Sequence, residues 1–467
     1  MSKVLFINPP SRRRVYLNTN VSVGTPNYPN LTLATLAGHL KDKYVVKALD
    51  MDLFSNYQEQ LKSTLNEFKP DIVVSSSKSP DFKVMTELIG LVKNFDKSIK
   101  IAVGGVHLTT YPDAIKELPD FDIAAFGEAD YVLPLFLEGH PLRKIQGVAY
   151  RRNGEIITTE KRNEPLDLNK LPYPNWEIFN ISTYKNSRLS SRLNPVGLIE
   201  TSRGCAFQCN YCNKLTFGSK YRTKEPKRVV EEMEYLLKIG FREIHIIDDS
   251  FTQSLTHAKS VCEEIINSKL TFPWSLINGI RVDCVDEEFF ALAKKAGCWQ
   301  VSFGIESGDQ KVLDKIGKRT TVEKITKAVH LAKKCKLDTF GFFILGLSGD
   351  TKESIEKTIT FAKSLPLDMA KFDIAIPYPG TPYYHELKAK NSILSEDFED
   401  YVVHRTDKPL FKHENLEWDE LKQLYYKAFR KYYLNVYYIL RRIKRSFLMN
   451  DLIYDINYFI KSKWYNN

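Results

Sequence analysis

The sequence predicts an α/β protein with a doubly wound, Rossmann-like (flavodoxin-like) domain, a partial (β/α)6 TIM barrel and a helical C-terminal extension. Two series of short apolar, β-branched runs alternating with helical stretches predict the first two parts. Apolar residues after Leu421 recur every three to four positions, which is the spacing of one helix face and predicts the extension. A chain of 467 residues is long enough for two or three domains. We expect these parts at 1–140, 196–382 and 383–467, with a hairpin and linker at 141–195.

The first series predicts a parallel sheet covered by helices on both faces. Its strands are apolar throughout, as is typical of strands buried on both sides. The expected strands are Val4–Ile7, Tyr44–Leu49, Asp71–Ser75, Ile101–Gly104 and Phe121–Phe126, and the expected helices are Leu31–Leu40, Gln58–Phe68 and Phe82–Asn94. Ile145–Tyr150 and Glu155–Thr158, joined across Arg152, Asn153 and Gly154, predict a small hairpin at the end of this sheet.

The second series predicts six βα units, and therefore an open, three-quarter barrel whose function lies at the C-terminal ends of its strands. A linker with prolines at positions 165, 172, 174 and 195 separates it from the first series. The expected strands are Val196–Thr201, Glu243–Asp248, Trp274–Ile280, Gln300–Ile305, Thr339–Leu345 and Met369–Ile376.

Composition excludes several classes of protein. No apolar run approaches the roughly 18 residues that span a bilayer, and the three residues before Val4 are too few for a secretory signal. We therefore expect a cytoplasmic protein whose seven cysteines are reduced. The net charge of +10 is concentrated between Leu421 and Asn450, where eight Lys or Arg occur without any Asp or Glu. The rest of the chain is close to neutral, which excludes a generally basic nucleic-acid binder.

Three cysteines follow the first barrel strand with the spacing C-x3-C-x2-C, at Cys205, Cys209 and Cys212. Three thiolates on one short loop can bind three irons of a [4Fe-4S] cluster and leave the fourth iron open for a small ligand. A structural zinc site requires four ligands, usually as two pairs. Cys262, Cys284, Cys298 and Cys335 each occur singly, so the sequence offers no second pair.

With this loop, residues 196 to about 382 resemble the radical S-adenosylmethionine (SAM) superfamily. The resemblance implies that SAM chelates the open iron and that one electron from the reduced cluster cleaves it to a 5′-deoxyadenosyl radical. It also implies SAM contacts at other positions. Tyr211 precedes the last cysteine and is expected near the adenine, and Arg281 is expected to pair with the SAM carboxylate.

Further SAM contacts are implied at the ends of three other strands. Asp248 and Asp249 stand where the family binds the SAM amino group, but the family pattern is Gly-Gly-Glu, so which carboxylate serves stays open. Glu306 and Ser307 match the ribose- and carboxylate-binding segment, and Phe342 and Gly346 match the segment along the adenine. Taken singly, each of these residues is equally consistent with a capping or turn role.

In the N-terminal domain, four strand ends carry candidate ligand-binding residues, because a doubly wound sheet binds ligands beyond the carboxyl ends of its strands. Spacing alone is equally consistent with tight βα turns. The domain resembles the cobalamin-binding domain that precedes many radical SAM modules, which implies cobalamin contacts at these residues: Asn8, Pro9, Pro10, Ser75, Ser76, Ser77, Gly104, Gly105, Val106, His107, Gly127 and Glu128.

The first loop departs from the pattern of classical corrinoid proteins, which place a cobalt-ligating histidine after the first strand. Here that loop is Asn8-Pro9-Pro10-Ser11-Arg12-Arg13, without histidine, so a cobalamin with no histidine ligand is expected. His107 follows the fourth strand and is expected to contact the nucleotide tail or to shape the loop. The loop Gly24–Asn30 is expected to lie against the corrin.

Two interpretations of the basic C-terminal element remain open. A tyrosine-rich helix or helix pair could pack on the barrel with its basic residues in solvent. Alternatively, its surface could attract anionic lipid headgroups or an acidic partner, giving a peripheral membrane contact.

The resemblance implies a cobalamin-dependent radical SAM enzyme that methylates an unactivated carbon of a small or lipid-like substrate through methylcobalamin. An oxidative cyclase or ring-contracting enzyme without methyl transfer is the nearest alternative. A non-catalytic iron–sulfur electron-transfer protein is a third, which the three-cysteine loop disfavours. We also expect an electron donor such as flavodoxin or ferredoxin and no nucleic-acid partner.

Overall fold

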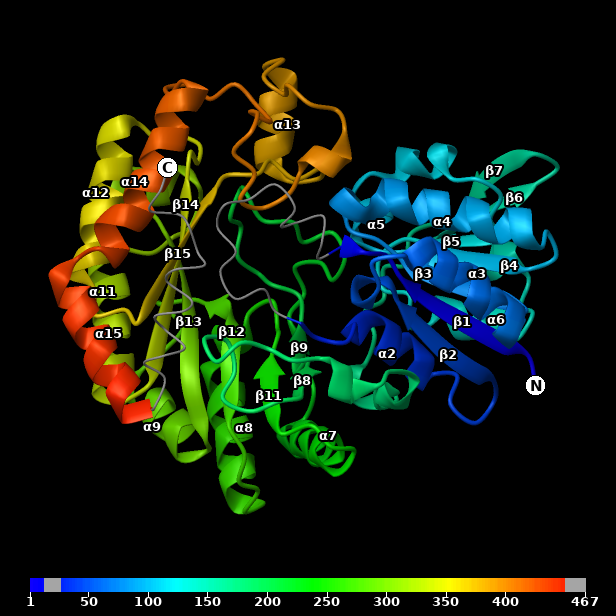
Figure 1. Cartoon of the computed structure of the whole chain (residues 1–467), viewed down its shortest axis with the longest axis horizontal. Coiled ribbons are helices and arrows are strands. Elements are labelled where there is room, and N and C mark those ends of the chain that lie inside the picture. Colours follow the sequence, from blue (N-terminus) through cyan, green and yellow to red (C-terminus); the bar gives the residue numbers. More distant parts are fainter. Residues whose placement is uncertain (12–26, 450–467) are drawn as a thin grey trace.

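The computed structural model describes residues 1–11 and 27–449, which form two α/β bodies and a C-terminal extension (Figure 1). Residues 12–26 and 450–467 lie outside the described part. The expectations for Arg12, Arg13 and the first half of the Gly24–Asn30 loop therefore fall outside it. Among the described residues, no helix is long and apolar enough to cross a membrane.

The N-terminal body contains a seven-stranded sheet in the order β2-β1-β3-β4-β5-β6-β7, and its first five strands are parallel. The order 2-1-3-4-5 is that of a flavodoxin-like sheet, as predicted. These strands are β1 (Lys3–Asn8), β2 (Val45–Asp50), β3 (Ile72–Ser76), β4 (Lys100–Gly104) and β5 (Ile123–Ala125). The predicted hairpin is also present as β6 (Val148–Arg152) and β7 (Glu155–Thr158), which pair antiparallel.

Alternate residues of β1 enter two different cores, which is why helices cover both faces of this sheet. Leu5 and Ile7 pack with α3 (Tyr57–Phe68) and α4 (Phe82–Phe95). Val4 and Phe6 pack with α2 (Leu31–Gly38) and α6 (Val132–Leu137), in a core that continues into the barrel. The two bodies therefore share apolar packing.

The second body is a partial barrel of six parallel strands in the order β8-β11-β12-β13-β14-β15. The two edge strands do not pair with each other, so the barrel is open, as predicted. The strands are β8 (Val196–Ile199), β11 (Glu243–Ile246), β12 (Trp274–Ile280), β13 (Cys298–Glu306), β14 (Asp338–Leu345) and β15 (Met369–Ile374). The helices between them are α7 (Pro226–Lys238), α8 (Leu255–Asn267), α9 (Glu287–Lys295), α10 (Gln310–Lys315), α11 (Val322–Lys334) and α12 (Lys352–Ser364).

The C-terminal extension begins with α13 (Pro382–Ala389) and ends with the predicted helix pair, α14 (Trp418–Tyr433) and α15 (Val436–Met449). Between them, residues 390–417 contain only the short η9 (Phe398–Asp400), although the sequence pattern was expected to turn helical after about residue 383. This segment instead reaches the N-terminal body, where the Phe398 ring lies 4.7 Å from the ring of His107. Its conformation follows these long-range contacts, which helical periodicity cannot reveal.

Candidate active site at the mouth of the barrel

The cysteine loop is held at its base by a two-stranded ribbon. After β8, the ribbon strand β9 (Ser202–Arg203) pairs antiparallel with β10 (Arg222–Thr223). Gly204 then adopts a φ of +86°, and a Cβ at this position would lie 2.4 Å from the carbonyl oxygen of Lys220. Only glycine fits such a close approach of two backbone segments. The turn that starts the loop is therefore fixed by local sterics.

Backbone hydrogen bonds tie the loop to the barrel at both ends. The Cys205 N–H donates to the Gly218 carbonyl oxygen at 3.2 Å, and the Asn210 N–H donates to the Ile316 carbonyl oxygen at 3.0 Å. The Ala206 N–H donates to the Gln253 side-chain oxygen at 3.0 Å. These bonds hold the loop in place without using the cysteine side chains.

The three cysteines that the sequence assigns to the cluster lie on this one loop. Cys209 is buried, Cys205 is half-buried and Cys212 is exposed, and the three lie close enough to influence one another's ionisation. Thiolates that influence one another in this way repel one another, and the irons of a bound cluster would supply the positive charge that offsets this repulsion. Cys284 also comes within electrostatic reach of Cys205, although it stands alone in the sequence.

Tyr211 and Glu306 meet at Lys318, a residue that the sequence did not single out. The Lys318 Nζ lies 2.8 Å from a Glu306 carboxylate oxygen and 3.3 Å from the Tyr211 hydroxyl. Glu306 has a φ of +66°, a strained conformation for a non-glycine residue and one that clusters at functional sites. No local motif marks Lys318, because its partners lie 12 and 107 positions away in the chain.

Two glycines make room for this group in the barrel lumen. A Cβ at Gly304 would lie 2.7 Å from the Glu306 carboxylate, and one at Gly279 would lie 2.8 Å from the Gly304 backbone nitrogen. Phe342 is half-buried beside them, and its ring lies 3.2 Å from the Cβ position of Gly279. The predicted SAM residues Tyr211, Glu306 and Phe342 therefore lie close together in the barrel.

Arg281 lies against the cysteine loop, at the end of β12. Its guanidinium stacks 3.7 Å from the centre of the Phe207 ring and comes within 3.9 Å of the Cys209 sulfur. It also forms an ion pair with Asp283 at 2.9 Å and donates to the Lys318 carbonyl oxygen at 2.6 Å. A SAM carboxylate would have to share this guanidinium with Asp283, so the predicted pairing remains a prediction.

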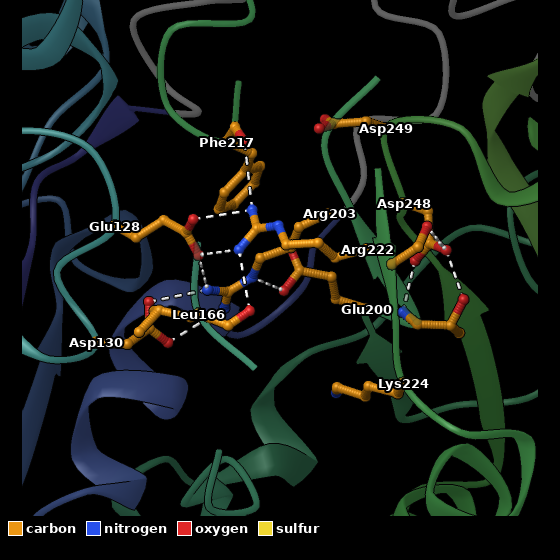
Figure 2. A network of polar contacts seen from close by, with 12 residues as sticks. Glu128, Asp130, Leu166, Glu200, Arg203, Phe217, Arg222, Lys224, Asp248 and Asp249 are labelled. Carbon is orange, nitrogen blue, oxygen red and sulfur yellow. Dashed lines mark hydrogen bonds and ion pairs between the residues drawn. The ribbon is translucent and has the colours of Figure 1, made fainter. Parts of the chain in front are cut away.

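The two neighbouring aspartates occupy different environments (Figure 2). Asp248 is buried and accepts hydrogen bonds from the Thr201 N–H, the Thr201 hydroxyl and the Ser202 hydroxyl at 2.5–2.6 Å. Burial raises the pKa of Asp248 to about 7, although these hydrogen bonds oppose the rise. Asp249 is exposed, and one of its oxygens accepts from the Gly204 N–H at 3.1 Å. Asp248 thus supports the start of the loop, whereas Asp249 faces the space beside it.

Two predicted SAM contacts take part in packing outside the lumen. The Ser307 hydroxyl lies 3.0 Å from the Thr358 hydroxyl of α12 and is buried. A Cβ at Gly346 would lie 2.8 Å from the Leu421 side chain of α14. The sequence placed both residues at strand ends but could not show which way each faces.

The predicted cobalamin residues lie along one edge of the N-terminal sheet, formed by residues 8–10, 75–77, 104–107 and 127–128 and called here the strand-end edge. Figure 1 shows β1 running toward the barrel. A Cβ at Gly127 would lie 3.7 Å from the carbonyl oxygen of Thr216, which follows the cysteine loop. The strand-end edge therefore faces the barrel.

Several side chains of the strand-end edge already have partners within the protein. The Asn8 amide donates to Asp50 at 2.8 Å and accepts from Asn30 at 2.7 Å. The Ser75 hydroxyl donates to the Ile7 carbonyl oxygen at 3.0 Å. A Cβ at Gly105 would lie 2.4 Å from the Ser77 carbonyl oxygen, so this glycine is required by the neighbouring loop whether or not a ligand is bound.

Two buried polar atoms at the strand-end edge fit a ligand. Within the described part of the chain, the Ser77 hydroxyl and the His107 Nε2 have no hydrogen-bond partner. The other ring nitrogen of His107 lies 3.1 Å from the Ser79 hydroxyl. An unmade hydrogen bond at a buried polar atom costs about 1–3 kcal/mol. The polar nucleotide tail of cobalamin is a chemically suitable partner for both atoms.

Glu128 takes part in an ion-pair network that joins the two bodies (Figure 2). Arg203, directly before the cysteine loop, binds Glu128 at 2.8 Å, Asp130 at 2.9 Å and Glu200 at 2.6 Å. Arg222 binds the second oxygen of Glu128 at 2.8 Å. The predicted cobalamin contact at Glu128 remains a prediction, but the carboxylate already holds two arginines of the barrel.

Comparison with known proteins agrees with both halves of this architecture. A family model of the radical SAM superfamily matches residues 199–362, and one of the B12 binding domain matches residues 19–137. An uncharacterized methyltransferase of Pyrococcus horikoshii is 31% identical over 440 residues, covering 92% of each chain. An anaerobic magnesium-protoporphyrin IX monomethyl ester cyclase of Rubrivivax gelatinosus is 29% identical over 423 residues, covering 88% of this chain and 74% of that protein.

Among solved structures, the cobalamin-dependent SAM radical enzyme OxsB with aqua-cobalamin and SAM bound aligns with a TM-score of 0.74. It shares 15% sequence identity, and the alignment covers 99% of this chain and 72% of that one, so it supports the fold. Taken with the three-cysteine loop and the strand-end edge, these likenesses show that the protein is an enzyme that uses a [4Fe-4S] cluster, SAM and cobalamin. The chain belongs to the radical SAM superfamily, among its members with an N-terminal B12-binding domain.

Proposed function

We propose that this enzyme methylates an unactivated carbon of a small or lipid-like substrate. The observation that carries the proposal is the attachment of the strand-end edge to the cysteine loop through Arg203, which sets the two cofactor-binding regions side by side. When bound, the cluster and SAM supply a radical that removes a hydrogen atom from carbon, and cobalamin supplies a carrier for a methyl group. Holding both at one substrate makes the transfer effectively unimolecular.

The residues of the chain have separate tasks in this proposal. Cys205, Cys209 and Cys212 hold the cluster. Tyr211, Glu306, Phe342 and Arg281 surround SAM, with Lys318 fixing the positions of Tyr211 and Glu306. Cobalamin lies along the strand-end edge, where Ser77 and His107 offer unpaired polar atoms within the described part of the chain.

Of the two aspartates, Asp249 is the one we assign to the SAM amino group. Its carboxylate is exposed and accepts only one hydrogen bond from the cysteine loop among the described contacts. Asp248 accepts three hydrogen bonds and is buried. A carboxylate surrounded by donors has little capacity left for an ammonium group.

The remaining partners are also proposals. The exposed Cys212 side of the loop supports electron delivery to the cluster by a flavodoxin or ferredoxin. The surface of α15 supports a peripheral membrane contact. The substrate in this proposal is a small molecule, and we expect the protein to act in the cytoplasm without a nucleic-acid partner.

The likeness to the magnesium-protoporphyrin cyclase favours one alternative, a cyclisation that uses the same cofactors without methyl transfer. The likeness to the P. horikoshii methyltransferase covers more of both chains and favours methylation. The two chemistries form different products from SAM, so an analysis of these products can distinguish them.

The test is anaerobic turnover of the reconstituted enzyme with methyl-labelled SAM, a reductant and a small-molecule extract as the source of substrate. A methylase forms S-adenosylhomocysteine together with 5′-deoxyadenosine, and the label appears in a product. The Cys205→Ala variant is the control, because it should form no deoxyadenosine. Deoxyadenosine with an unlabelled product and no S-adenosylhomocysteine would refute methylation in favour of cyclisation.

A further inference from the structure

The outer face of α15 is unusually apolar. In the described part of the chain, six of the thirteen exposed large hydrophobic side chains fall within ten residues, and they are Leu434, Val436, Tyr437, Ile439, Leu440 and Ile443. Tyr437 is 77% exposed and Leu440 is 60% exposed. Single apolar side chains are common on protein surfaces, but a cluster of this kind marks an interaction site.

Two of the three arginines of α15 face the barrel, which inverts the usual arrangement of a surface helix. The Arg441 guanidinium donates to the Leu367 carbonyl oxygen at 2.5 Å, and Arg445 forms an ion pair with Asp338 at 2.6 Å. Between them and α14, the Tyr438 ring packs 5.2 Å from Tyr432 and 5.0 Å from Tyr433. The sequence expectation of basic residues in solvent over a buried apolar stripe is therefore wrong for these two arginines.

Basic charge nevertheless borders the apolar face. Lys431 and Lys444 are exposed, and no Asp or Glu occurs between Leu421 and Asn450. A cationic border around exposed apolar and tyrosine side chains matches the interfacial region of a bilayer that contains anionic lipids.

The same charges disfavour a second copy of the chain as the occupant. A two-fold interface would set the α15 face against itself, so lysines would meet lysines with no acidic residue of this segment to pair with. Like charges brought together at an interface oppose association. The apolar face therefore needs a partner that is both apolar and negatively charged.

We propose that α15 lies flat on a membrane that contains anionic lipids, with Val436, Tyr437, Leu440 and Ile443 inserted at the level of the headgroups. Figure 1 shows α15 along the outer side of the barrel, at the end of the molecule opposite to the N-terminal body. Attachment through α15 leaves the contact between the two bodies away from the lipid. Arg441 and Arg445 anchor the helix to the barrel, so insertion of its outer face does not require it to detach.

The experiment is flotation of the full chain with vesicles of phosphatidylcholine alone and of phosphatidylcholine mixed with phosphatidylglycerol. The protein should float with the anionic vesicles, and less so in high salt, since ionic screening weakens the contribution of the lysines. Leu440→Glu should lower the partition coefficient about tenfold or more, because it replaces an inserted apolar side chain with a charge. Leu394→Glu is the matched control: Leu394 is 56% exposed but lies outside α15, and its variant should float like the wild type.

Three results would overturn the proposal. The first is a wild type that stays unbound with anionic vesicles at low salt, and the second is equal flotation of Leu440→Glu and Leu394→Glu. The third comes from sedimentation without lipid. If the wild type is a dimer and Leu440→Glu is a monomer, the apolar face binds a second copy of the chain. Circular dichroism of both variants checks that each is folded, and the cluster content provides an independent check of the barrel.

Discussion

The mouth of the barrel and the strand-end edge of the N-terminal body use their polar residues in different ways. At the mouth, Lys318 joins Tyr211 of the cysteine loop to Glu306 at the end of β13. At the strand-end edge, Asn8 and Ser75 form hydrogen bonds with other residues of the same body. Glu128 instead binds the arginines of the barrel.

The two regions therefore differ in which parts of the protein determine their geometry. At the barrel mouth, Lys318, Tyr211 and Glu306 all belong to the barrel, so their geometry depends on one body. The N-terminal body offers an edge whose polar groups mostly pair with one another, with two buried unpaired atoms in the described part. Arg203 of the barrel and the apolar core that the two bodies share hold this edge in position. Substitutions should therefore act locally at the mouth and on the joint between the bodies at the strand-end edge.

The largest effect is expected from the cluster ligands. Cys205→Ala, Cys209→Ala or Cys212→Ala should each abolish the visible absorbance of the cluster and all cleavage of SAM, because each thiolate would bind a different iron in the predicted site. Cys284→Ala is the sharp control, since its thiol lies within electrostatic reach of Cys205 but outside the loop. A Cys284→Ala protein that fails to assemble the cluster would contradict the open fourth iron.

Substitution of Arg203 tests the joint between the bodies. Arg203 is only 5% exposed, and Arg203→Met leaves Glu128, Asp130 and Glu200 without their shared cation. Breaking a buried network of this kind costs about 3–5 kcal/mol of the free energy of unfolding.

The matched control for this joint is Lys83→Met. Lys83 of the N-terminal body pairs with Glu399 of the C-terminal extension at 3.3 Å, but its side chain is 60% exposed. An exposed pair contributes about 1 kcal/mol or less. Denaturant unfolding measures both variants, and equal stabilities would show that the Arg203 network does not join the bodies.

Within the barrel, Lys318→Met should weaken SAM binding by about tenfold or more, or ~1.4 kcal/mol. It removes the cation that orients Glu306 and Tyr211 and leaves the carboxylate unpaired in the barrel. Lys311→Met, on the exposed side of α10, is the control and should bind SAM normally. Equilibrium binding of SAM to the reconstituted enzyme measures the difference; identical affinities would remove Lys318 from the site.

Acid should destabilise the strand-end edge through His107. Burial lowers the pKa of His107 from 6.5 to about 4, so the folded protein resists a proton that the unfolded chain accepts. This contribution to stability is present well above pH 6.5 and is lost as the pH falls toward 4, by about 2 kcal/mol between pH 7 and 5.

Unfolding at pH 7 and pH 5 tests this, because His107→Gln should reduce the pH dependence. A variant whose stability falls as steeply as that of the wild type would assign the titration to other histidines. His257 serves as the comparison within the barrel, since burial also lowers its pKa to about 4.

The smallest signal is spectroscopic. Bound cobalamin should lack a histidine ligand, because the described part of the first loop carries none and His107 is buried beside Ser79. Electron paramagnetic resonance of the cobalt(II) form should therefore show no nitrogen splitting from an imidazole. His107→Gln should leave this spectrum unchanged; an imidazole signal that the variant loses would make His107 the ligand.

Much of the fold was predictable because it depends on local patterns. The apolar strands and helices repeat at short spacing, and their order gave both the flavodoxin-like sheet and the open barrel. The cluster loop was equally visible, since its three cysteines lie within eight residues. Most candidate contact residues could be found from the predicted ends of the strands, but the direction in which each side chain points could not.

The tertiary structure alone decided which partners those residues meet. Arg203 and Asp130 are 73 positions apart, and no spacing rule predicts that they pair. Asp248 and Asp249 are adjacent and chemically identical, yet only the fold buries one and exposes the other. In α15 the sequence determined a helix with apolar and basic residues, but its contacts with Leu367 and Asp338 decided that two arginines turn inward. Local periodicity specifies an element, whereas the direction it faces depends on groups brought near by distant parts of the chain.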